Sequence, residues 1–138
     1  MGLTIQETVL ITGGSSGIGY AIAREFASRG YKLILVSNQQ EQLKKVAAEF
    51  NEKFNTETRT LFLDLAAPDA AEKLYAWCGQ QNLTVDILVN NAGMLIFREI
   101  VETGMEKTKN ILALHTTTPA LICTLFAKDM KQKRKGNI

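Results

Sequence analysis

Residues 12–19, with the sequence TGGSSGIG, have the composition of a phosphate-binding turn. They follow the apolar run at residues 8–11 and open a segment with helical periodicity, so a strand, a glycine turn and a helix are predicted in that order. We expect Gly13 to adopt a positive φ, Gly17 to let the backbone approach a pyrophosphate, and Gly19 to let the helix pack closely. The N-terminus of the helix would then face the phosphates.

Two further signals stand at the ends of later predicted strands. The pair Asp64 and Leu65 follows the apolar run at residues 60–63, and the sequence NNAG at residues 90–93 follows the run at 87–89. In an open parallel sheet, ligands bind outside the carboxyl ends of the strands, so the three signals predict one site. In order and spacing they resemble the short-chain dehydrogenase/reductase family, and the resemblance spans essentially the whole chain.

That resemblance implies a bound NAD(P), with its pyrophosphate on the glycine loop. Asp64 would hydrogen-bond the adenine amino group and Leu65 would supply a backbone amide, although capping of a turn is an alternative role for Asp64. Thr12 is expected to tie the loop to the neighbouring strand end through its hydroxyl. Asn90 would serve the structure, while the small residues Ala92 and Gly93 would leave room for the inner ribose.

The residues after the second predicted strand bear on the choice of cofactor. An acidic side chain there would bind the ribose 2′-hydroxyl of NAD, and a basic one the 2′-phosphate of NADP. Ser37 and Asn38 are neither, and Ser16 in the loop is also uncharged. Because no carboxylate repels a phosphate, we expect NADP rather than NAD, with hydrogen bonds from Ser37 and Asn38 in place of a salt bridge. The predicted cofactor-binding residues are Gly13, Ser15, Ser16, Gly17, Ile18, Gly19, Ser37, Asn38, Asp64, Leu65, Asn91, Ala92 and Gly93.

The resemblance also implies a catalytic serine and a Tyr-x-x-x-Lys pair, which this sequence does not hold in place. None of its tyrosines, Tyr20, Tyr31 and Tyr75, is followed four residues later by lysine. His115 stands where the family often has the asparagine of a proton relay, so it is the candidate catalytic residue, and a packed structural histidine is the alternative. No metal site is predicted.

Three functions stay open. Residues 1–138 are expected to form a single NAD(P)-binding domain that ends before the catalytic serine, tyrosine and lysine. They would be the front half of an oxidoreductase that transfers hydride between the cofactor and an alcohol or carbonyl. The alternatives are a nucleotide-binding module without catalysis and an interaction fragment with an open strand edge.

The elements that would position this site alternate between strand-like and helix-like periodicity. That alternation predicts an α/β fold, a Rossmann-like doubly wound parallel sheet of four strands with flanking helices that ends at the start of a fifth strand. Gly30 should end the first helix, Trp77 should lie in the core, and Pro119 should kink the last helix, where residues 116–118 would satisfy the freed backbone groups. The predicted strands are residues 8–11, 32–36, 58–63 and 85–89; the predicted helices are 16–28, 39–50, one from 68–69 onward and 102–133; and residues 136–138 open the fifth strand.

Composition limits the partners. The chain has 138 residues and a net charge of +2, and its excess basicity lies within the last eleven residues. Such a charge run is typical of a solvated helix end, so we expect neither nucleic acid nor membrane as a partner. Without a leader-like N-terminus, a cytoplasmic location is expected, with Cys78 and Cys123 as reduced thiols. The expected partners are a small alcohol or carbonyl substrate and, through the long helix, further copies of the chain.

Overall fold

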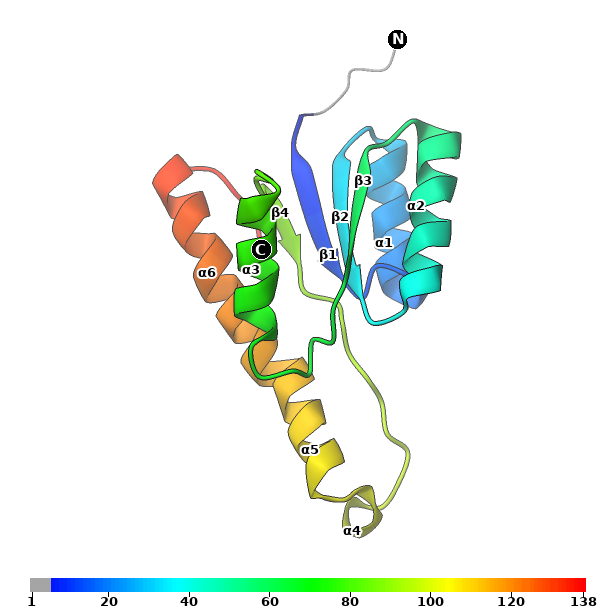
Figure 1. Cartoon of the computed structure of the whole chain (residues 1–138), viewed down its shortest axis with the longest axis vertical. Helices are drawn as coiled ribbons and strands as arrows, with labels where there is room; N and C mark the ends of the chain where they lie inside the picture. Colours follow the sequence, from blue (N-terminus) through cyan, green and yellow to red (C-terminus); the bar gives the residue numbers. More distant parts are fainter. Residues whose placement is uncertain (1–5) are drawn as a thin grey trace.

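A computed structural model of the chain describes residues 6–138, which contain one parallel sheet (Figure 1). Its strands are β1 (Thr8–Thr12), β2 (Lys32–Ser37), β3 (Thr58–Phe62) and β4 (Ile87–Val89), in the spatial order β3-β2-β1-β4. The strand order reverses direction at β1, because β2 lies on one side of it and β4 on the other. Such a reversal opens a crevice at the carboxyl ends of the strands.

Helices cover both faces of this sheet, as the predicted doubly wound fold requires. Helices α1 (Gly17–Ser28) and α2 (Gln40–Phe54) pack on one face, and α3 (Ala70–Gln80) and α6 (Thr118–Lys133) pack on the other (Figure 1). The Rossmann-like prediction is therefore confirmed. Gly30 follows α1 with φ +86°, so its predicted role in ending that helix is confirmed too.

The strands are apolar on both faces because helices cover both. Side chains alternate between two hydrophobic clusters, one under α1 and α2 and one under α3 and α6. Phe50 is fully buried in the first cluster, where its ring centroid lies 5.6 Å from that of Tyr20 and 6.0 Å from that of Phe54. The first cluster takes Val9, Ile11, Leu33 and Leu35 from the strands, and the second takes Leu10, Ile34, Val36 and Leu88.

The last helix begins three residues later than the predicted start at about residue 102. A short turn, α4 (Ile100–Thr103), is followed by Gly104 at φ +76°, and α5 (Met105–Leu112) begins only after it. A positive φ is incompatible with continuation of a right-handed helix, so Gly104 separates the two elements. Strand β4 also begins two residues later than predicted.

The irregularity expected at Pro119 lies in the turn before it. A π-helical turn, η1 (Ala113–Thr117), joins α5 to α6, and Pro119, which has no N–H to donate, follows this turn at the start of α6. The prediction that Thr118 satisfies a backbone group of its own helix is wrong. Its hydroxyl instead donates to the Leu65 carbonyl oxygen at 2.8 Å. Helix α6 is thereby attached to the segment after β3.

The burial of Trp77 and of the two cysteines can be compared with the predictions. Trp77 is only half-buried at the edge of the second cluster. Cys78 is buried and burial raises the pKa of its thiol to about 11, while Cys123 is half-buried, and both are free cysteines. Asn137 forms an isolated parallel bridge with Ile87, and the Leu88 N–H donates to the Asn137 carbonyl oxygen at 2.9 Å, so the chain pairs with β4 at the place where a fifth strand is predicted.

The helical stretch Met105–Lys133 qualifies the expectation about membranes. By length and composition alone it is apolar enough to cross a bilayer, with a mean hydropathy of 1.3 in its most apolar window. Four of its side chains, Thr118, Ile122, Phe126 and Met130, are buried in the structure. The core helix of an α/β domain passes the same test, so the criterion does not by itself assign a membrane role.

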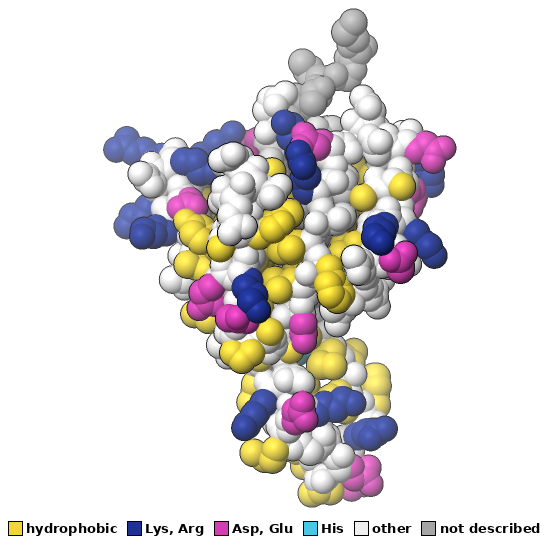
Figure 2. Space-filling model, in the orientation of Figure 1, with side chains coloured by type: hydrophobic (Ala, Val, Ile, Leu, Met, Phe, Trp, Pro, Cys, Tyr) yellow, Lys and Arg dark blue, Asp and Glu magenta, His cyan; other side chains and the backbone are white. Residues whose placement is uncertain are grey.

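Exposed apolar side chains gather where α4 and α5 project from the sheet (Figure 2). Phe97 is 91% exposed, and the other large apolar side chains of this projection are exposed as well. A patch of this kind is typical of an association surface, but the predicted oligomer stays a prediction. The other large exposed apolar residues of the projection are Leu95, Ile100, Val101, Met105 and Leu112.

We expect Phe50→Ala to lower the free energy of unfolding by about 3–5 kcal/mol, because it leaves a cavity between α1, α2 and the sheet. Phe62→Ala is the matched control: Phe62 is 56% exposed, so the loss should be below about 1 kcal/mol. Urea unfolding followed by circular dichroism measures both. Equal losses for the two variants would contradict this assignment of the core.

Candidate functional site

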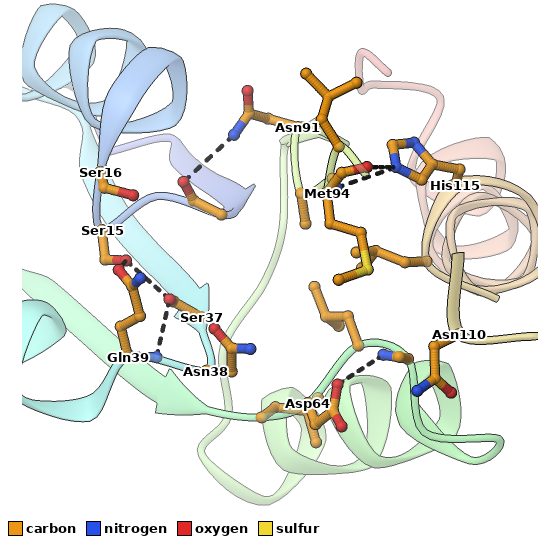
Figure 3. Close-up of a pocket in the computed structure, with 18 of the residues that line it drawn as sticks. Ser15, Ser16, Ser37, Asn38, Gln39, Asp64, Asn91, Met94, Asn110 and His115 are labelled. Carbon is orange, nitrogen blue, oxygen red and sulfur yellow. Dashed lines mark hydrogen bonds between the residues drawn. The ribbon is translucent and has the colours of Figure 1, made fainter. Parts of the chain in front are cut away.

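An open pocket of about 650 Å³ lies at the carboxyl ends of the strands (Figure 3). The loops after all four strands contribute to it, together with α5 and η1. Most of the predicted site residues meet here, although they are far apart in the sequence. Those that line the pocket are Gly13, Ser15, Ser16, Ile18, Ser37, Asn38, Asp64, Leu65, Asn91, Ala92, Gly93 and His115.

Two predicted glycines shape the loop without lining the pocket. Gly17 has φ +56° and open space where a side chain would project. At Gly19 a methyl group would overlap the Gly13 carbonyl oxygen and the Asn91 side-chain amide, so only glycine fits. Gly13 has the expected positive φ, +68°. The glycine spacing therefore reflects turn geometry and the close approach of α1 to the loop.

The N-terminus of α1 opens toward the same pocket. Ser16 is the N-cap residue with an extended backbone, and its side chain makes no capping hydrogen bond. The first N–H groups of a helix have no partner within the helix, and the helix dipole places partial positive charge there. With no acidic residue in this first turn, the helix end favours an anion.

The loops after β1 and β4 are joined by hydrogen bonds in both directions. The Thr12 hydroxyl oxygen accepts from the backbone N–H groups of Asn91 and Ala92, each at 3.0 Å. In return the Asn91 side-chain amide donates to the carbonyl oxygens of Thr12 at 3.1 Å and Gly13 at 3.3 Å. The predicted tie through Thr12 is confirmed. Asn91 therefore has a structural role of the kind that was predicted for Asn90.

A closed ring of hydrogen bonds lies at the end of β2. The Gln39 N–H donates to Ser37 Oγ at 3.1 Å, Ser37 Oγ lies 2.8 Å from Ser15 Oγ, and the Ser15 hydroxyl donates to Gln39 Oε1 at 3.2 Å. Since Ser15 donates to Gln39, the Ser37 hydroxyl must donate to Ser15. Its proton is therefore committed within the ring, whereas Asn38 is exposed on the pocket wall beside it.

Asp64 has the turn-capping role that the sequence offered as an alternative, and its hydrogen bond to an adenine stays a prediction. Its Oδ1 accepts from the Ala66 N–H at 2.9 Å, which caps the turn after β3, and the residue also lines the pocket. Among the described residues that line the pocket, Asp64 carries the only charged side chain. An anionic ligand would therefore be held by backbone and neutral polar groups.

His115 faces the opposite end of the pocket from Ser37 (Figure 3). Its Nε2 lies 3.0 Å from the Met94 nitrogen and 2.9 Å from the Met94 oxygen. A Cβ on Gly93 would lie 2.8 Å from His115 Cε1, so the imidazole fills the space beside this glycine. The π-helical turn η1 carries His115 to this position from the long helix.

Sequence reasoning missed several lining residues because no motif marks them. Gln39 directly follows the predicted pair Ser37 and Asn38, so its position was the available signal. The others enter through tertiary contacts, and no sequence pattern separates them from ordinary loop and helix residues. The lining residues not predicted are Gln39, Leu63, Ala66, Met94, Leu95, Asn110 and Leu114.

Comparison with known proteins covers almost the whole chain. A family model described as short chain dehydrogenase matches residues 7–138. Very-long-chain 3-oxoacyl-CoA reductases from Bos taurus and Rattus norvegicus are 39% and 34% identical over 143 aligned positions, which cover 100% of this chain and 45% of each relative. The chain thus spans less than half the length of these curated relatives.

A solved structure is also similar to almost the whole chain. A short-chain dehydrogenase from Sphingobium yanoikuyae in complex with NADPH has a TM-score of 0.87 and 31% identity, covering 95% of this chain and 52% of that one. The matched regions include the glycine loop, Asp64 and residues 90–93, which the structure brings to one pocket.

We expect Thr12→Val to lower the free energy of unfolding by about 2 kcal/mol, because the N–H groups of Asn91 and Ala92 lose their acceptor without a change in packing volume. Thr12→Ser keeps the hydroxyl and should cost less than about 1 kcal/mol. Chemical denaturation of both variants measures the difference. A serine variant as unstable as the valine variant would show that the methyl group, not the hydroxyl, matters.

Gly19→Ala should lower the free energy of unfolding by about 1–3 kcal/mol, because the added methyl forces α1 away from the loop. Gly79→Ala is the matched control. Gly79 lies in α3 with no atom within 4 Å of an added Cβ, so this substitution should raise stability by up to about 1 kcal/mol. Thermal and urea unfolding separate the two. A neutral Gly19→Ala would contradict the close approach described above.

Proposed function

Because the chain belongs to the short-chain dehydrogenase family, we propose that its pocket binds NADP(H) and serves an oxidoreductase. The reaction is hydride transfer between the nicotinamide and the oxygen-bearing carbon of an alcohol or carbonyl substrate. When bound, the cofactor supplies or accepts the hydride. This chain's residues bind the cofactor and orient it.

One observation carries the proposal: the uncapped N-terminus of α1 opens into the same pocket as the ends of β1, β2, β3 and β4. Its N–H groups suit a pyrophosphate, with Gly17 leaving open space in front of them. The adenosine would then lie toward Asn38 and Asp64, and the nicotinamide toward Gly93 and His115. A pocket of about 650 Å³ is within the range of cofactor sites.

NADP is favoured over NAD by the neutral end of β2. Ser37, Asn38 and Gln39 at the end of β2 carry no carboxylate that would repel a 2′-phosphate, and Asn38 can donate to it. Ser37 contributes less than its sequence position suggests, because its proton is committed to Ser15. The similar Sphingobium structure holds NADPH, which supports the same choice.

The substrate proposal rests on the relatives. The bovine and rat proteins are named very-long-chain 3-oxoacyl-CoA reductases, so a 3-oxoacyl thioester is the carbonyl substrate to test first. A non-catalytic nucleotide-binding module is the second candidate, because the pocket is assembled entirely from residues 13–115. NADPH oxidation with a 3-oxoacyl-CoA by the full-length protein separates the two: ADP-ribose binding without turnover favours the module.

The cofactor proposal predicts that the wild type binds NADPH more tightly than NADH. Asn38→Asp should weaken NADPH binding by roughly tenfold or more and leave NADH binding largely intact, because a carboxylate repels the 2′-phosphate but can accept from a 2′-hydroxyl. Isothermal titration calorimetry measures both dissociation constants.

Asn51→Asp is the matched control, since Asn51 is exposed on α2 and the substitution adds the same charge outside the pocket. It should leave both constants unchanged. Tenfold tighter binding of NADH than of NADPH by the wild type would refute the preference for NADP. A wild type that binds neither nucleotide would refute the proposed function.

A further inference from the structure

We propose that the apolar surface beside the nicotinamide end of the pocket binds the acyl chain of a long-chain 3-oxoacyl thioester. The inference rests on the proposed function, which makes such a thioester the first substrate to test. Its structural basis is a second hollow beside the cofactor pocket and an exposed apolar surface that continues from it. We call this surface the acyl tract, and its members are Met94, Leu95, Phe97, Ile100, Val101 and Met105.

The second hollow lies next to the cofactor pocket. It has a volume of about 520 Å³ and is formed by Met94 after β4, the end of α4 and the first residues of α5. Met94 and Asn110 line both the cofactor pocket and this hollow, so the two spaces are neighbours across these side chains (Figure 3). A substrate whose carbonyl carbon lies at the nicotinamide end can therefore extend past Met94 into the second hollow.

Exposed apolar side chains continue from this hollow over the projection of α4 and α5 (Figure 2). Met105 lines the hollow and is 75% exposed, and Leu95 lines the cofactor pocket and is 82% exposed. Phe97, Ile100 and Val101 are exposed to a similar degree. Contact with an apolar ligand would remove these side chains from water, which is favourable, and would bury the apolar surface of the ligand as well.

The charges of the same stretch favour a neutral chain over an anionic surface. Residues 95–112 contain three basic and three acidic side chains, so their net charge is zero. Attraction to an anionic membrane or to a nucleic acid depends on an excess of lysine and arginine. An acyl chain carries no charge and needs only apolar contact.

Continuity with the cofactor pocket favours an acyl chain over a second copy of this chain. Met94 and Leu95 belong both to the acyl tract and to the pocket lining, so a ligand on the tract also reaches the reacting end of the cofactor. A dinucleotide occupies most of a pocket of about 650 Å³, so a long acyl chain needs apolar surface outside it. The bovine and rat relatives are named very-long-chain 3-oxoacyl-CoA reductases, which agrees with such a surface.

The test compares lauroyl-CoA with butyryl-CoA, which share the CoA group and the thioester and differ in chain length. Isothermal titration calorimetry of the full-length protein measures both dissociation constants. Each buried methylene group tightens binding by up to about fourfold, so the wild type should bind lauroyl-CoA at least about tenfold more tightly than butyryl-CoA. Met105→Ser should weaken lauroyl-CoA binding about five- to tenfold and change butyryl-CoA binding less than about twofold.

Two further variants separate this effect from damage to the fold. Phe97→Ser removes a side chain that lies almost wholly in solvent, so it leaves the core intact and should show the same selective loss. Phe62→Ser is the matched control, because Phe62 is an exposed apolar residue on β3 that lines neither hollow. It should leave both dissociation constants unchanged.

The inference is overturned if the wild type binds the two thioesters equally, or if the tract variants weaken both equally or neither. It is also overturned if light scattering shows a wild-type oligomer that dissociates in the tract variants, because a second copy then covers the surface. Binding of the wild type, but not of the tract variants, to phosphatidylcholine vesicles would assign the surface to lipid instead. NADPH binding should be the same in all variants. If the wild type binds no NADPH, the proposed function fails, and the chain-length comparison alone then decides whether the tract binds an acyl chain.

Discussion

The exchange of hydrogen bonds between Thr12 and the segment after β4 is the interaction on which the pocket depends. Strand β4 is only three residues long, and its pairing with β1 ends at Val89. Beyond that point, the Thr12 hydroxyl and the Asn91 side-chain amide continue the connection. Gly13 lies between these bonds and α1. The same contacts therefore hold the glycine loop against the segment after β4. The pocket is thus held by polar contacts just past the region where the hydrophobic core ends.

An anionic ligand in this pocket would meet dipoles instead of cationic side chains. The N-terminus of a helix carries about half an elementary charge, spread over N–H groups that need no rearrangement. Asp64 adds a negative charge to the lining, but its Oδ1 is held by the Ala66 N–H in the turn after β3. The two serine hydroxyls and the Gln39 N–H likewise donate within the Ser15, Ser37 and Gln39 ring, whereas the side-chain amide nitrogen of Gln39 takes no part in it. Recognition is left to backbone amides and to neutral side chains of the lining such as Ser16 and Asn38.

Parts of this site that depend on local chemistry could be predicted from the sequence. A positive φ at Gly13 and the strand-end position of Asp64 follow from residue type and periodicity, and the structure has both. The Gln39 contact with Ser15 could not be predicted, because it joins residues 24 positions apart through tertiary packing. The helix break at Gly104 could not be predicted for another reason. Helical periodicity continues across this residue, and only its positive φ interrupts the helix.

One turn of the long helix connects both ends of the pocket. His115 contacts Met94 after β4, and three residues later the Thr118 hydroxyl donates to the Leu65 carbonyl oxygen after β3. The two contacts therefore come from positions only three residues apart and reach two different loops. The π-helical turn η1 contains His115 and ends at Thr117, and Pro119 has no N–H to bond within α6. His115 within this turn and Thr118 just after it both bond to loops of the pocket, so a change in the helix register would move both walls together.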